Sequence, residues 1–76
     1  MRLELIKMPK EYGQSDLTYR RYVITINGII VEELKEGSID TERRSYFDNR
    51  VRERIAVFEQ ALGVKAKRYR VYEEIQ

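Results

Sequence analysis

The sequence predicts a single small α+β domain over residues 1–76, with its elements in the order β-β-β-α-β. An Asn27-Gly28 pair separates two runs rich in β-branched residues, which is typical of a tight antiparallel hairpin. Apolar residues then recur at helical spacing between about residues 40 and 62, and an alternating segment follows. We therefore expect a mainly antiparallel four-stranded sheet, with one long amphipathic helix packed on one face.

The first element is a strand over residues 2–8, with Leu3 and Leu5 on one face and Ile6 and Met8 on the other. Pro9 and Gly13 then interrupt the pattern and predict a loop.

The next two strands form the hairpin. The second strand runs from Leu17 or Tyr19 to Ile26, and the third runs from Ile29 to about Lys35. A two-residue turn pairs Ile26 with Ile29 and Ile24 with Val31, and directly opposed residues share a face. The face expected to meet the helix carries Tyr22, Ile24, Ile26, Ile29 and Val31. The other face carries Tyr19, Val23, Ile30 and Leu34.

The helix is predicted by Phe47, Val51, Ile55, Phe58 and Leu62, which recur at spacings of four, four, three and four. Asp40 or Thr41 is the expected N-cap, Gly63 is the expected terminating residue, and residues 65–75 form the last strand. The predicted core is Leu3, Leu5, Ile24, Ile26, Ile29, Val31, Phe47, Val51, Ile55, Phe58, Leu62 and Val71.

The composition excludes most kinds of catalysis. The chain has neither histidine nor cysteine, so it lacks the usual nucleophile and base pairs and the usual zinc ligands. Its four glycines are scattered and build no phosphate-binding loop. We expect a protein that is not an enzyme, with no cofactor, no metal and no small-molecule substrate. Without a long apolar run we also expect no membrane partner and a cytoplasmic location.

A protein-interaction module is the leading functional interpretation. One helix covers one face of a sheet, so Tyr19, Val23, Ile30 and Leu34 are expected to form an uncovered apolar face. Exposed apolar patches of this kind often bind proteins. We expect self-association, as a homodimer, or docking on a larger protein partner. The small size is typical of accessory, regulatory or inhibitor proteins of phages and mobile elements.

Nucleic-acid binding is the alternative interpretation. Arg43, Arg50 and Arg54 form one stripe along the helix, and Lys67, Arg68 and Arg70 alternate with tyrosines in the last strand. Arginine and lysine neutralise phosphates, and tyrosine stacks on unpaired bases. The two groups would form one DNA- or RNA-binding surface if the last strand lay beside the helix stripe. The net charge of +2 is low for a dedicated nucleic-acid-binding protein.

Overall fold

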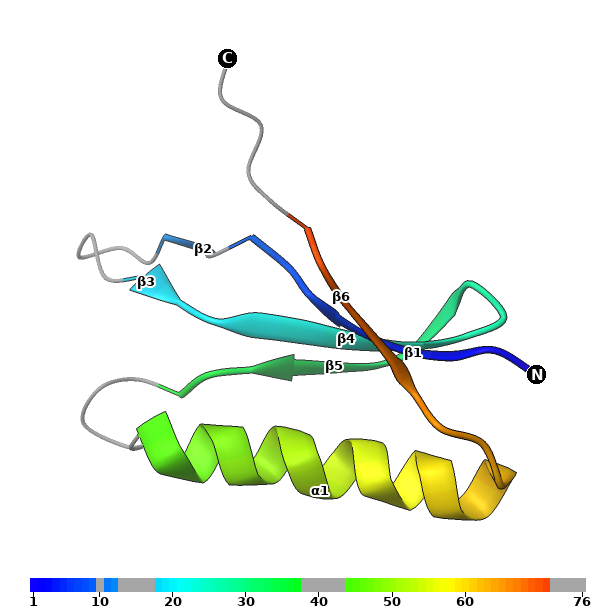
Figure 1. The fold of residues 1–76 in the computed structure, drawn as a ribbon. Helices are drawn as coiled ribbons and strands as arrows, with labels where there is room; N and C mark the ends of the chain where they lie inside the picture. The colour runs from blue at the N-terminus through cyan, green and yellow to red at the C-terminus, as the bar shows by residue number, and fades with distance from the viewer. Residues whose placement is uncertain (10, 13–17, 38–43, 72–76) are drawn as a thin grey trace.

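A computed structural model describes residues 1–9, 11–12, 18–37 and 44–71 (Figure 1). It confirms the α+β class, with a four-stranded sheet in the order β5-β4-β1-β6, one helix, and a separate ribbon of β2 and β3. The elements are β1 (Leu3–Lys7), β2 (Glu11–Tyr12), β3 (Thr18–Tyr19), β4 (Arg21–Ile26), β5 (Ile29–Lys35), α1 (Arg44–Leu62) and β6 (Lys67–Arg70).

The sheet is mixed, which corrects the prediction of a mainly antiparallel sheet. β4 pairs antiparallel with both β5 and β1, so β5 and β1 point in the same direction. α1 carries the chain back along the sheet, and β6 therefore runs in the direction of β5 again. β6 pairs with β1, and that pairing is parallel. The helix connection that a parallel crossover requires is α1 itself.

The turn of the hairpin is as predicted. Asn27 has a φ of 51° and Gly28 a φ of 84°, so both central residues have the positive φ that a type I′ turn requires. Ile26 pairs with Ile29 across this turn. Asn27 also accepts a hydrogen bond on its side-chain oxygen from the backbone N–H of Arg2, at 2.9 Å, which ties the turn to the start of the chain.

A β-bulge beyond the turn changes the register of the hairpin. Ile24 lies opposite Glu32, and Tyr22 lies opposite Leu34. The predicted pairing of Ile24 with Val31 is therefore wrong, because β5 holds one residue more than a regular ladder would. The bulge moves Leu34 and Glu32 to the helix side of the sheet, since directly opposed residues share a face.

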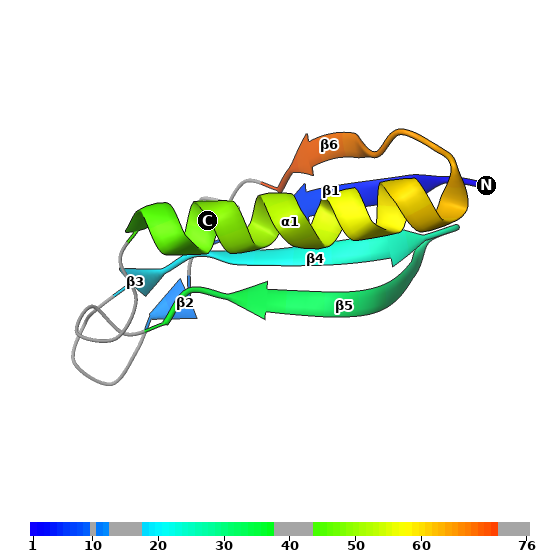
Figure 2. The ribbon, with the colours of Figure 1, turned by 90° about the horizontal axis from the view of Figure 1, so that it is seen from below.

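The core lies between α1 and one face of the sheet (Figure 2). Phe47 is fully buried, and its ring centroid lies 5.8 Å from that of Tyr22 on β4. Burial of each large apolar side chain contributes roughly 1.5–3 kcal/mol. The buried core cluster consists of Leu3, Leu5, Ile24, Leu34, Phe47, Val51 and Ile55. Residues that pack against it while partly buried are Tyr22, Ile26, Phe58, Leu62, Val64 and Ala66.

Three residues of the predicted core are exposed instead. Ile29 is 69% exposed and Val31 is 45% exposed, because they lie at the turn and at the bulge of an edge strand. Val71 is 43% exposed and follows the last residue of β6, at the opposite edge of the sheet. The predicted core lacked Leu34, which the bulge brings inward.

The end of the helix is as predicted, whereas its start lies outside the described residues. Gly63 has a φ of 68°, and its N–H donates to the carbonyl of Glu59 at 2.9 Å, as in a glycine-terminated helix. The proposed N-caps Asp40 and Thr41 are not among the described residues. Within residues 65–75, the structure assigns Lys67–Arg70 to β6.

Candidate interaction surfaces

A nearly buried arginine joins three elements. Arg20 is 7% exposed and lies between β3 and β4. Its Nη2 donates to Oε2 of Glu36 at 2.9 Å, and its Nη1 donates to Oδ1 of Asp48 at 2.6 Å. Its guanidinium also lies 5.0 Å from the centroid of the Phe47 ring. The contacts fasten the start of β4 to the residue after β5 and to the first turns of α1.

Arg20 forms a charged cluster with Glu36 and Asp48 that stabilises the fold. Burial lowers the pKa of Arg20, but the hydrogen bonds and charges of Glu36 and Asp48 outweigh it, so the pKa is raised overall. The guanidinium therefore stays charged, and a second hydrogen bond joins the backbone N–H of Arg20 to Oε1 of Glu36 at 3.1 Å. In the sequence Arg20 is one of a basic pair, and nothing there identifies its two distant acidic partners.

Two arginines of the predicted helix stripe attach α1 to β5. Nη2 of Arg54 donates to Oε1 of Glu32 at 2.7 Å, and its Nε donates to Oε2 at 2.8 Å, which is a bidentate pair. Arg50 donates to the backbone carbonyl of Lys35, and its guanidinium lies 5.2 Å from the ring centroid of Phe47. The hydrogen bond from Arg54 lowers the pKa of Glu32, although burial acts in the opposite direction.

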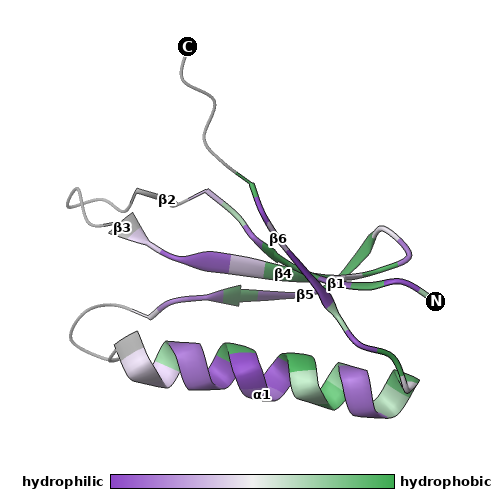
Figure 3. Ribbon diagram, in the orientation of Figure 1, coloured by the Kyte–Doolittle hydropathy of each residue, from purple (hydrophilic) through white to green (hydrophobic). Residues whose placement is uncertain are grey.

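The structure divides the predicted basic surface into separate parts. Arg50 and Arg54 contact β5, whereas Lys67, Arg68 and Arg70 lie on β6. β5 and β6 are the opposite edges of the four-stranded sheet, so the two groups do not form the continuous surface that was predicted. Arg43 lies outside the described residues. All four residues of β6 are exposed, and the strand is mostly hydrophilic (Figure 3).

The four residues of the predicted protein interface do not share one uncovered face, which corrects that prediction. Leu34 is 8% exposed and belongs to the core under α1, because of the bulge. Val23 is 2% exposed and lies between Ile6 and Glu33 in the register of the sheet. Tyr19 is half-buried in the separate β2–β3 ribbon.

Ile30 remains exposed and belongs to a different apolar surface. Ile29, Ile30 and Val31 are 69%, 61% and 45% exposed, and they occupy three consecutive positions at the start of β5. We call these three residues the hairpin surface (Figure 3 shows hydrophobic colour at this end of the hairpin). Ile29 and Ile30 project from opposite faces of the sheet, so this surface is the edge of β5 rather than one face. Val57 is 51% exposed and lies on the side of α1 that carries Arg54, three residues earlier.

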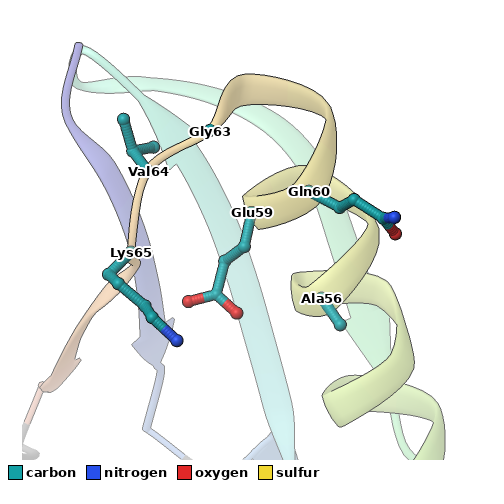
Figure 4. Close-up of a pocket in the computed structure, with 6 residues that line it drawn as sticks. All are labelled: Ala56, Glu59, Gln60, Gly63, Val64 and Lys65. Carbon is teal, nitrogen blue, oxygen red and sulfur yellow. The ribbon is translucent and has the colours of Figure 1, made fainter.

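Two hollows lie on the β6 side of the molecule. The first has a volume of about 340 Å³ and lies where α1 turns into β6 (Figure 4). The carboxylate of Glu59 points into it and accepts a hydrogen bond from the backbone N–H of Ala66 at 2.9 Å, so this acid holds the helix-to-strand connection. The second hollow has a volume of about 290 Å³ and is lined by Leu5, Lys7, Tyr22, Arg68, Tyr69 and Arg70.

Comparison with known proteins adds no functional assignment. No protein-family model, curated protein or solved structure matches the chain. Over the residues that the structure describes, histidine, cysteine and acidic side chains nowhere gather in a group of three or more suited to a metal ion. In the same part of the chain, α1 is neither apolar enough nor poor enough in charge to cross a membrane.

Proposed function

We propose that the protein is a non-catalytic interaction module that self-associates through the hairpin surface. The observation that carries the proposal is the exposure of Ile29, Ile30 and Val31, three consecutive uncharged apolar residues on an edge strand. Edge strands normally carry charges, prolines or a cover that prevents association. The first half of β5 has neither a charge nor a proline, whereas its second half carries Glu32, Glu33 and Lys35.

A second copy of the chain is the partner that best fits this surface. A two-fold interface places the same patch on both sides, so an uncharged apolar patch is complementary to itself. The charged second half of β5 restricts the contact to the hairpin end, because a longer overlap would place acidic residues near one another. A domain of this size also buries a small fraction of its surface alone, and association adds apolar burial. An accessory or regulatory role on a larger protein would use the same surface.

The test is the oligomeric state of three versions of the full chain, measured by sedimentation equilibrium between about 5 and 200 μM, a range suited to micromolar association. The wild-type chain should form dimers. Ile30→Lys should be monomeric, because lysine on an edge strand prevents pairing and apolar contact. Val71→Lys is the matched control, since Val71 is also an exposed apolar residue, at 43%, but lies at the opposite edge.

A wild-type chain that is monomeric throughout this range would overturn the proposal. So would dimers of Ile30→Lys as stable as those of the wild type. Equal loss of dimers in Ile30→Lys and Val71→Lys would place the interface elsewhere. Circular dichroism of each variant shows whether the fold is retained, so that a loss of association is not confused with unfolding.

A further inference from the structure

A second surface, at the β6 edge, has a different chemistry. Lys65, Lys67, Arg68 and Arg70 occur within six residues, and no acidic residue separates them. All four residues of β6 are exposed, and Arg70 lies beside Lys7 of β1 in the register of the sheet. A run of exposed cations of this kind favours a ligand that carries negative charge.

Nearby acidic groups are committed to other contacts. Glu4 lies beside Lys67 in the register, but its carboxylate forms an ion pair with Arg2, in which Oε1 of Glu4 lies 2.9 Å from Nε of Arg2. Glu59 accepts the backbone N–H of Ala66. Within the described ranges, Lys65, Lys67 and Arg68 form no ion pair, so their charge adds to the potential of the edge. Glu73 and Glu74 follow in the sequence outside those ranges, and experiments on this edge therefore need the full chain.

Aromatic groups accompany these cations. The hollow of about 290 Å³ at this edge is lined by Tyr22 and Tyr69 together with Lys7, Arg68 and Arg70. Tyr69 is 47% exposed, and none of the residues that line the hollow comes from α1. Tyr69 is the exposed ring of this hollow, and along β6 it alternates with Arg68 and Arg70. A strand that crosses the edge can therefore meet the arginines on one face and the ring on the other. Unpaired bases stack on exposed rings while cations hold the phosphates.

We propose that the β6 edge binds single-stranded nucleic acid. The backbone of the strand would follow the cations of β6, and a base would stack on Tyr69. A duplex fits less well, because no described helix or ribbon protrudes from this edge to enter a groove. β6 is about 13 Å long at 3.3 Å per residue, so it spans only a few nucleotides. We therefore expect micromolar rather than nanomolar affinity.

The binding test uses fluorescence anisotropy with labelled 20-nucleotide oligothymidine and oligouridine, a 20-base-pair duplex, and polyglutamate as an unrelated polyanion. Affinity for the single strands should exceed that for the duplex and polyglutamate. It should fall strongly between about 50 and 200 mM salt, because binding releases counterions from the phosphates. Absence of single-strand binding at the lower salt would overturn the proposal. Equal binding of polyglutamate would also overturn it and would indicate an acidic protein partner instead.

Two matched pairs of variants locate the contact. Arg68→Gln should weaken binding and reduce the slope of log affinity against log salt by about 0.7, the effect of one phosphate on a single strand. Arg52→Gln removes the same charge from the exposed side of α1 and should leave the slope unchanged. Tyr69→Leu should weaken binding roughly 5- to 100-fold through lost stacking. Tyr46→Leu, at a tyrosine 61% exposed on α1, should have no effect.

Equal losses within either pair would overturn the assignment to β6, even if the chain bound single strands. The outcome is separable from self-association, because the β6 edge and the hairpin surface lie at opposite edges of the sheet. Ile30→Lys should therefore bind at least as well per chain as the wild type. A loss of binding in that variant would contradict the placement of the ligand on β6.

Discussion

The register of the hairpin makes opposite predictions for two residues of one strand. With the bulge, Leu34 lies in the core at 8% exposure and Val31 is 45% exposed. In a regular hairpin the positions would be reversed, because Val31 would lie opposite Ile24 under the helix. Truncation of each side chain to alanine therefore distinguishes the two registers, and each variant is a control for the other.

The expected magnitudes differ several-fold. Leu→Ala substitutions in cores cost about 2–5 kcal/mol from lost burial and the remaining cavity. Leu34 lies on an edge strand, where neighbours can partly close the space, so we expect about 2–4 kcal/mol for Leu34→Ala. Val31→Ala removes an exposed side chain from a bulge and should cost about 0.5 kcal/mol or less.

Urea unfolding followed by far-ultraviolet circular dichroism measures both values, with the m-value as a check that the unfolded states are comparable. A greater loss of stability in Val31→Ala than in Leu34→Ala would refute the bulged register. Deletion of Val31 is an independent check. It should leave Glu32 and Leu34 on the helix side, because a regular ladder then brings the same residues opposite Ile24 and Tyr22. A deletion variant that fails to fold would contradict that pairing.

Two further predictions concern the turn and the helix contact. Gly28→Val should lower stability by roughly 1–3 kcal/mol, because the φ of 84° is strained for a β-branched residue. Asn27→Asp should be nearly neutral, because aspartate tolerates positive φ and keeps an acceptor for the N–H of Arg2. Equal melting temperatures of the two variants would contradict the turn. The lowered pKa of Glu32 means that its pair with Arg54 stabilises the fold above the ordinary glutamate pKa, and that this contribution is lost as pH falls through the lowered value. The Glu32→Gln variant should therefore lose less stability on acidification than the wild type. Urea unfolding at neutral and acidic pH measures the free energy of unfolding of both chains, and an equal loss in both would count against the pair.

Local signals in the sequence predicted the local structure well. The type I′ turn depends only on the two residues at its centre, and Asn27 and Gly28 both accept positive φ. The helix end depends on Gly63 and on the period of the apolar residues before it. The bulge has no comparable signal. Val31 is as suitable for a strand as Ile29, and the contacts that the extra residue permits are tertiary: Leu34 packs in the core and Glu32 pairs with Arg54.

The candidate surfaces were predicted less well, because each depends on which elements become neighbours. Arg50 and Arg54 have the spacing of a binding stripe, yet one contacts a carbonyl of β5 and the other forms a bidentate pair with Glu32. Arg68 lies at the other edge of the sheet, where the described residues offer it no carboxylate. All three positions hold the same residue type. The strand order therefore decides which arginines form contacts within the fold and which are available to a ligand.

The direction of the last strand could have been inferred before the strand order. Two antiparallel pairings place β1 and β5 in the same direction, and one helix between β5 and β6 restores that direction. If β1 pairs with β4, the outer edges of the three-stranded sheet are β1 and β5, and β6 is parallel to either. The prediction of a mainly antiparallel sheet did not take this constraint into account.

The direction of β6 does not determine which edge of the sheet it joins, and that choice has functional consequences. β6 beside β5 would have covered Ile29, Ile30 and Val31 and placed its cations near Glu32 and Glu33. β6 beside β1 leaves the apolar hairpin surface and the basic edge exposed on opposite sides of one small domain.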